Sequence, residues 1–306
     1  MTFKELLKEK NDRLESVPLA MQSAMDKQQS KILKLINSQL SELTTTNGQI
    51  DVTAANIRQI TIISDELKQV FLTKEYVNAV KEFAREFSAQ TVLADQLIAA
   101  QFGNAAKSAA VEGSALAASA YIEIAKRSAI DALVGAPIDK EFIKPIQGIL
   151  ENAVVNGATF GETLEAVNQF VDGNANSVSR LKKYAKQITN DSFSVADRSY
   201  TSVISEALDN DWFYYSGTEL DSTRCFCQER VGNYYHYKEI ESWGDGKNLG
   251  DCNAGGGEWA GMIVGTNSKT IYSYLGGYNC THSLIPVSEF IIPESDILRA
   301  KAKGFI

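Results

Sequence analysis

Residues 18–43, PLAMQSAMDKQQSKILKLINSQLSEL, decide the architecture of the first part of the chain. The large apolar side chains recur at three- and four-residue spacings, which places them on one face of a helix: Met21, Met25, Ile32, Ile36, Leu40 and Leu43. Gln29 fills the one gap in this stripe. Residues 44–48, TTTNG, are typical of a turn. The segment therefore predicts a long amphipathic helix that ends near residue 43.

Helical patterns continue as far as residue 134. A second helix is expected to begin near Asp51 or Thr53, either of which can cap it, and to run to about residue 71. Residues 77–98 predict another helix, and Gly103 and Asn104 mark a break. Residues 105–134 are rich in alanine and serine. They favour close packing in a helical hairpin, and a flexible or oligomer-contacting helix is the alternative.

Shorter helices are expected after the break at residues 135–137. One covers residues 140–155, and Thr159 with Glu162 fits a capping box that opens the next. Two further helices are predicted between residues 178 and 208. The first of these carries a basic cluster, interpreted as a solvated face with a DNA-facing patch as the alternative: Arg180, Lys182, Lys183 and Lys186.

The last third of the chain has a different composition. All four cysteines and both histidines lie between positions 225 and 282, and the three tryptophans all follow position 211. Short aromatic and threonine-rich runs there favour strands. We predict an α+β fold, with a mainly α-helical N-terminal two-thirds followed by a small β-containing, loop-rich C-terminal module. The predicted domains are residues 1–136, a long-helix region of unknown partner, and residues 137–306, divided into a helical lead-in (137–211) and the module (212–306).

Charge and hydropathy narrow the functional classes. The 306 residues carry a formal charge of -8, from 30 basic and 38 acidic side chains, which argues against a general nucleic-acid binder. No stretch reaches the roughly 18 uninterrupted apolar residues of a membrane span. The start of the chain, Met1 to Glu5, runs straight into charged residues, so no secretory signal is expected.

Two pairs of soft ligands form the candidate site. Cys225 and Cys227 stand in a C-x-C pattern, and Cys280 and His282 follow about fifty residues later. Two such pairs can close a tetrahedral zinc site, so these four residues are the candidate structural zinc ligands. The one-residue gap of C-x-C is shorter than the usual spacing of zinc knuckles. Reduced, partly buried thiols and a disulfide therefore remain alternatives.

A thiol nucleophile is the catalytic alternative. Cys227 or Cys280 could be activated by His236 or His282, but no orienting residue or oxyanion-hole motif stands out. The three glycines at 255–257 lack the Lys-Ser/Thr of a phosphate-binding loop. We therefore predict that the chain is not an enzyme, with no catalytic residues and no residues for an organic cofactor.

The C-terminal strings resemble a known family. The first contributes Asp221, Thr223, Arg224, Cys227, Gly232 and Tyr234; the second contributes Gly277, Tyr278, Asn279, Cys280 and His282, followed by Leu284-Ile285-Pro286. In this order they are similar to the phage Mu F-like minor head protein family, also called the phage head morphogenesis domain. The resemblance covers roughly the last 165 residues. Many members carry C-x-x-C where this chain has C-x-C, and an Arg where it has Thr281.

The resemblance implies a structural minor head protein of a tailed bacteriophage. Such a protein is expected in the virion, at the phage head or portal vertex, and in the host cytoplasm during assembly. The implied partners are portal protein, major capsid protein or both, other virion proteins and packaged DNA, with no membrane. It would act in head assembly and aid DNA packaging or delivery. The alternatives are a virion-carried enzyme, either a thiol hydrolase or a toxin-like effector, and a DNA-contacting packaging protein that uses the basic cluster.

Overall fold

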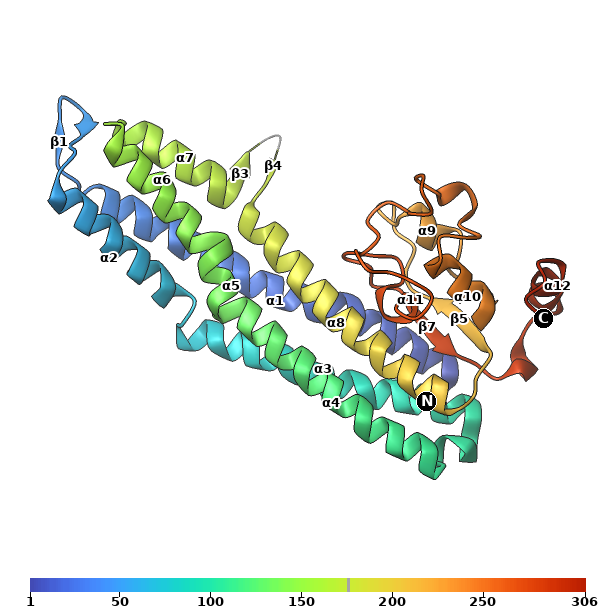
Figure 1. The fold of residues 1–306 in the computed structure, drawn as a ribbon. Helices are drawn as coiled ribbons and strands as arrows, with labels where there is room; N and C mark the ends of the chain where they lie inside the picture. Colours follow the sequence, from blue (N-terminus) through green and yellow to red (C-terminus); the bar gives the residue numbers. More distant parts are fainter. Residues whose placement is uncertain (175–176) are drawn as a thin grey trace. The chain divides into compact units, whose positions relative to one another are not determined.

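The computed structural model describes residues 1–174 and 177–306. It is mostly helical with small antiparallel sheets, which confirms the predicted α+β class (Figure 1). The helices are α1 (Phe3–Leu40), α2 (Ala54–Val70), α3 (Lys74–Phe102), α4 (Ala109–Val134), α5 (Ala136–Ile138), α6 (Lys144–Val155), α7 (Phe160–Asp172), α8 (Arg180–Ala207), α9 (Cys225–Gln228), α10 (Tyr237–Gly244), α11 (Ile271–Tyr274) and α12 (Glu294–Ala302). The strands are β1 (Thr45–Thr46), β2 (Gln49–Ile50), β3 (Gly173–Asn174), β4 (Ser177–Val178), β5 (Trp212–Ser216), β6 (Tyr234–His236) and β7 (Ser283–Pro286). Within the described residues, none of these helices is long and apolar enough to cross a membrane.

The chain forms two compact units. Unit 1 comprises residues 1–18, 85–126 and 190–306, and unit 2 comprises residues 19–84 and 127–189. This division differs from the boundary drawn at residues 136 and 137 from the sequence. The reason is that α1, α3, α4 and α8 each contribute residues to both units.

Local sequence signals in unit 2 produce the expected structure. The predicted apolar stripe of α1 is buried from Met21 to Leu40. Thr53 caps α2 by accepting a hydrogen bond from the Asn56 amide, and Thr159 with Glu162 forms the predicted capping box of α7. These interactions involve residues three apart, so the sequence alone was sufficient to find them.

Two helix predictions need correction. Helix α1 begins at Phe3, well before residue 18, and contains Pro18. Leu6 and Leu14 are also buried and extend its apolar stripe toward the N-terminus. The two helices expected between residues 178 and 208 form the single helix α8, because neither glycine nor proline interrupts residues 180–207.

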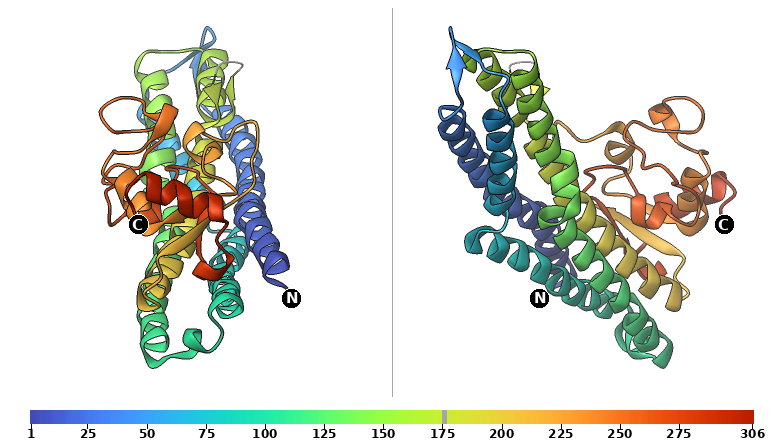
Figure 2. Two further views of the ribbon diagram at one scale, coloured as in Figure 1. Left: turned by 90° about the vertical axis from the view of Figure 1, so that its right-hand side faces the viewer. Right: turned by 60° about the vertical axis from the view of Figure 1, so that its left-hand side comes forward.

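The C-terminal module of unit 1 is built on a three-stranded antiparallel sheet in the order β6-β5-β7. Strand β5 is central: Trp212 pairs with His236 of β6, and Phe213 pairs with Pro286 of β7. The short helices α9, α10 and α11 belong to this module, which Figure 2 shows in orange to red from two further sides. Large buried aromatic residues fill the core that they share: Phe213, Tyr215, Phe226, Tyr235, Trp243 and Trp259.

A buried polar cluster joins distant segments of unit 1. The ammonium group of Lys10 in α1 pairs with the carboxylate of Asp197 in α8, and both side chains are fully buried. Gln90 of α3 donates to the same carboxylate at 3.2 Å, and Ser283 of β7 donates to it at 3.1 Å. One carboxylate thus connects three helices and a strand.

Replacing Lys10 by Ala should destabilise the protein strongly. The substitution leaves the Asp197 carboxylate buried without its cation, a change that typically costs about 3–5 kcal/mol in free energy of unfolding. Urea unfolding monitored by circular dichroism measures this loss. Lys8→Ala is the matched control on the same helix, because Lys8 pairs with Asp12 in solvent, where an ion pair contributes about 1 kcal/mol or less. Equal losses in the two variants would contradict the assignment.

Candidate functional site

Secondary structure brings three of the four predicted zinc ligands together. Cys227 lies in α9, and Cys280 and His282 lie directly before β7. The Sγ atoms of Cys227 and Cys280 are 3.8 Å apart, and Cys280 Sγ is 3.8 Å from His282 Nδ1. Tyr215 in β5 donates its hydroxyl to Cys227 Sγ at 3.3 Å. The candidate site is therefore a buried cluster of two thiols and one imidazole beside the central strand.

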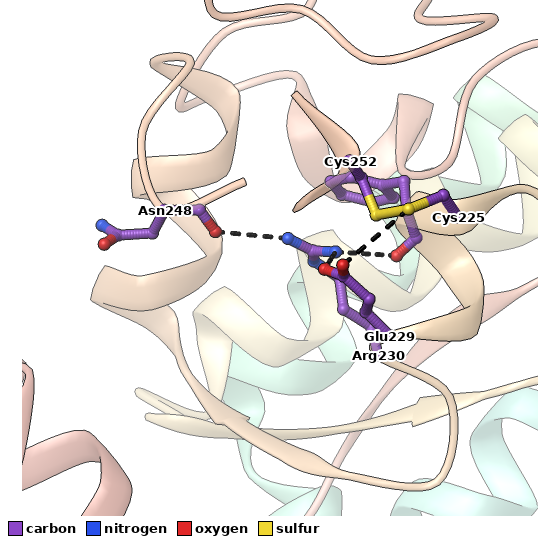
Figure 3. The surroundings of a disulfide bond; sticks show 6 residues. Cys225, Glu229, Arg230, Asn248 and Cys252 are labelled. Atoms are coloured by element: carbon purple, nitrogen blue, oxygen red, sulfur yellow. Dashed lines mark hydrogen bonds and ion pairs between the residues drawn. A yellow bond between two sulfur atoms is a disulfide. The ribbon is translucent and has the colours of Figure 1, made fainter. Parts of the chain in front are cut away.

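The fourth predicted ligand, Cys225, lies elsewhere. It forms a disulfide with Cys252, and the Arg230 guanidinium lies beside this bond, donating to the Asn248 carbonyl at 3.2 Å (Figure 3). Side chains in a C-x-C pattern lie on the same side of the chain only where the backbone is extended. Both lie on helix α9, where residues two apart point about 200° apart, so Cys227 faces the core and Cys225 faces solvent.

Two glycines make room for the cluster. A Cβ atom on Gly276 would lie 2.3 Å from Cys227 Sγ and 2.7 Å from Cys280 Sγ. A Cβ atom on Gly217 would lie 2.3 Å from the His282 ring. Both distances are far below van der Waals contact, so any larger side chain at either position would displace the cluster.

The two thiols differ in acidity. Contact with Cys280 raises the pKa of Cys227, and burial raises it further. The same contact lowers the pKa of Cys280, and His282 and the Arg198 guanidinium lower it further, against the effect of burial. Cys280 is thus the more acidic of the two thiols.

The distances are compatible with a tetrahedral metal ion. Two sulfurs at about 2.3 Å from one zinc ion are separated by about 3.8 Å at the tetrahedral angle. The observed Sγ–Sγ distance is 3.8 Å, and the ligand atoms of Cys227, Cys280 and His282 all lie within 4.8 Å of one another. The second such group, Cys225 with Glu229 and Cys252, includes both sulfurs of the disulfide. A disulfide sulfur is not a thiolate ligand, so the buried cluster is the better metal site.

A thiol nucleophile would need access to substrate, and the cluster is closed. Cys227, Cys280 and His282 are 2 %, 3 % and 5 % exposed. His236, the other histidine considered for catalysis, caps α10 by accepting a hydrogen bond from the Lys238 amide and packs against Trp212. Cys280 contacts His282, but both side chains are buried and a substrate in solution does not reach them.

The residues that carry the family resemblance have identifiable structural roles. Thr223 accepts a hydrogen bond from the Leu220 amide at 2.8 Å, and Arg224 donates to the Gly276 carbonyl at 3.4 Å. Gly232 donates its amide to the Tyr215 carbonyl at 2.9 Å. Asp221 lies on the exposed turn that precedes α9.

In the second string, Gly277 and Asn279 adopt backbone conformations with a positive φ. Gly277 has a φ of 95°, and its Cβ would lie 1.9 Å from the Gly261 carbonyl oxygen. Asn279 also has a positive φ and donates its amide to the Asp191 carboxylate of α8. The two strings therefore meet at the buried cluster.

The sequence analysis predicted helices in this region but did not connect α8 with the cysteine cluster. Arg198 of α8 is buried and donates to the carbonyls of Cys280 and His282 at 3.4 and 3.3 Å. Burial raises the pKa of Asp191 to about 6, while the Asn279 amide and Arg198 oppose that shift. The sequence signal for this buried face was the recurrence of polar residues at helical spacing along α8. A search for apolar stripes does not detect it.

Comparison with known proteins found no matching family model, no similar curated protein and no similar solved structure.

Substituting Gly276 by Ala should disrupt the cluster without removing a ligand. The new methyl group overlaps both sulfurs, and overpacking of this kind typically costs about 1–3 kcal/mol. Chemical denaturation measures the loss, and faster labelling of Cys227 and Cys280 by a thiol reagent reports the opening of the site. Gly148→Ala is the control, because that glycine lies in α6 with open space around it and the change should be neutral or stabilising. Unchanged stability and labelling in Gly276→Ala would contradict the described packing.

Proposed function

We propose that this chain is a structural minor head protein of a tailed bacteriophage that associates with portal or capsid protein during head assembly. The observation that carries the proposal is the convergence of the two strings that resemble the phage Mu F-like family. They are separated by about fifty residues in sequence, yet Arg224 contacts the Gly276 carbonyl and Cys227 contacts Cys280. Residues that act together in one fold are expected to recur together in a family.

Burial of the thiols supports a structural role over an enzymatic one. A hydrolytic cysteine is normally a partly exposed thiolate beside a base. Here the sulfur with the lowered pKa, Cys280, is enclosed by Cys227, His282 and Arg198. The cluster serves better as an internal cross-link of the module than as a nucleophile.

The basic cluster of α8 gives limited support to DNA contact. Arg180 pairs with Glu141 at 3.2 Å, and Lys182 lies 3.8 Å from Asp26. These carboxylates reduce the positive potential that a phosphate backbone would meet. The solvated-face interpretation therefore remains the better one for these residues.

As part of the same proposal, Cys227, Cys280 and His282 hold a structural zinc ion. Zinc would stabilise the loop-rich module by tying α9 to the segment before β7, since metal binding free energy adds to folding free energy. His282 would coordinate through Nδ1, the ring atom that faces Cys280. The Tyr215 hydroxyl lies 3.3 Å from Cys227 Sγ and would neighbour the bound ion.

Elemental analysis tests the zinc assignment. Protein purified without chelator should contain about one zinc ion per chain, and Cys227→Ser and His282→Ala should each lose it. The matched control is Cys225→Ser, which removes a cysteine of the disulfide and should retain the metal. Wild-type protein without stoichiometric zinc, or equal loss in Cys225→Ser, would reject the assignment.

Quantitative mass spectrometry of purified phage particles tests the function. The chain should be present at a fixed low copy number relative to portal protein and should co-sediment with portal in immature heads. Recovery only in the free protein fraction, with none in particles, would refute the proposed function. The result does not depend on whether the cysteine cluster holds zinc.

A further inference from the structure

A second group of metal-ligating side chains lies on the exposed face of α9 in unit 1. Cys225, Glu229 and Cys252 each offer one ligand atom, and these three atoms lie within 4.8 Å of one another. The two sulfurs are joined in a disulfide (Figure 3). Reduction would turn them into thiols, which bind zinc as thiolates, so the group becomes a complete set of ligands only in the reduced state.

Helix α9 places the Glu229 carboxylate beside Cys225. The two residues are four positions apart, and the Glu229 amide donates to the Cys225 carbonyl at 3.0 Å, which closes one helical turn. Their side chains therefore lie on the same face, with Cys225 Sγ 3.8 Å from Glu229 Oε1. Both residues are exposed, so this face of α9 is open to solvent.

The turn that carries Cys252 also lies against this carboxylate. The turn η3 (Gly250–Cys252) approaches α9 so closely that a Cβ atom on Gly250 would lie 2.6 Å from Glu229 Oε2. Gly250 has a φ of 64°, a conformation that favours glycine. The Cα atoms of Cys225 and Cys252 are 5.5 Å apart. The glycine and the cysteine of this turn thus bring its backbone to both ligands on α9.

The disulfide is not the only connection between α9 and the segment that leads into η3. The guanidinium of Arg230 donates to the Phe226 carbonyl at 2.9 Å and to the Asn248 carbonyl at 3.2 Å. It also packs over the Phe226 and Trp243 rings, 4.0 and 4.6 Å from their centroids. Because these contacts do not involve sulfur, we expect the two thiols to stay close together after reduction.

The charge of the reduced group suits a divalent cation. Two thiolates and one carboxylate carry three negative charges, and the Arg230 guanidinium, which donates to Glu229 Oε2 at 3.3 Å, carries one positive charge. A divalent ion balances the remainder. Thiolate ligands select zinc and similar soft ions over magnesium or calcium. Water from the exposed face can supply the fourth ligand of a tetrahedral site.

We propose that Cys225, Cys252 and Glu229 form a redox-controlled site for zinc or a similar soft divalent cation. A dithiol reductant supplies two electrons and two protons, the S–S bond breaks, and the reductant leaves as its own disulfide. The ion then binds both sulfurs, releases their two protons and gains the carboxylate as a third ligand. The metal-bound form belongs to reducing surroundings and the disulfide to oxidising ones. The site depends neither on the phage function nor on metal in the buried cluster.

The zinc content of the full chain, measured with and without reduction, tests the proposal. The protein is incubated with zinc chloride in the presence or absence of a phosphine reductant, and unbound ion is removed by gel filtration before elemental analysis. Reduction should add about one zinc ion per chain, since opening one disulfide completes one site. Cys225→Ser and Cys252→Ser should each abolish this increment. An unchanged zinc content on reduction would overturn the proposal.

Glu229→Gln tests the third ligand in a chain that keeps both cysteines. It should weaken zinc binding to the reduced protein by about tenfold or more, measured by competition with a chromophoric chelator. The matched control is Glu258→Gln, an exposed position shortly after Cys252 and outside the ligand group. Its affinity should stay within about twofold of wild type, because exposed charges are screened by salt. Equal affinities in the two variants would remove Glu229 from the site.

His282→Ala separates this site from the buried cluster. The substitution removes a ligand of that cluster, and the zinc gained on reduction should remain. Retention of the increment, even where the unreduced protein holds no zinc, supports the site on α9 and rejects only the buried one. Loss of the increment in His282→Ala would show that the added ion sits in the buried cluster and would overturn the proposal.

Discussion

The buried ion pair between Asp197 and Lys10 is the interaction on which the rest of unit 1 depends. A charge buried away from water must be matched by a cation and by hydrogen-bond donors, or it destabilises the fold by several kcal/mol. Lys10, Gln90 and Ser283 supply these partners from α1, α3 and β7. Because Ser283 directly follows His282, the same carboxylate that ties the helices together also fixes the strand that leads out of the cysteine cluster.

Helix α8 carries further buried polar side chains along its length. Its buried face is polar at three- and four-residue spacings: Ser194, Asp197, Arg198, Thr201 and Ser205. Arg198 holds the carbonyls around Cys280, and Asp191, one turn before Ser194, receives the Asn279 amide. Asp197 and Arg198 specify the register of this face, since their hydrogen bonds form only with the partner groups in place. The Oγ atoms of Ser194 and Ser205 form no hydrogen bond among the described residues. One helix therefore positions the segments around two strings that lie far apart in sequence.

Short-range signals in the sequence were sufficient for much of the helical structure and for part of the site. The stripe from Met21 to Leu40 and the Thr159 capping box depend on neighbours three or four residues away, so periodicity and residue type determine them. The disulfide could not be found in this way, because the partner of Cys225 is chosen by how residues 225–252 close into a loop. The buried partners of Asp197 are likewise contributed by segments up to 187 residues away.

The four cysteines form two separate pairs, because Cys225 and Cys227 point in different directions from helix α9. Cys225 points outward and is cross-linked to Cys252 near the surface, whereas Cys227 points inward and meets Cys280 beneath the central strand. A reductant in solution reaches the disulfide through Cys225, which is exposed, since thiol–disulfide exchange requires access to sulfur and Cys252 is buried. The buried pair is protected by Gly276, His282 and Tyr215, which leave no space for an attacking thiol. The module therefore carries one disulfide with an exposed cysteine and one buried pair of free cysteines, and only the buried pair lies within the packing that joins α8 to the sheet.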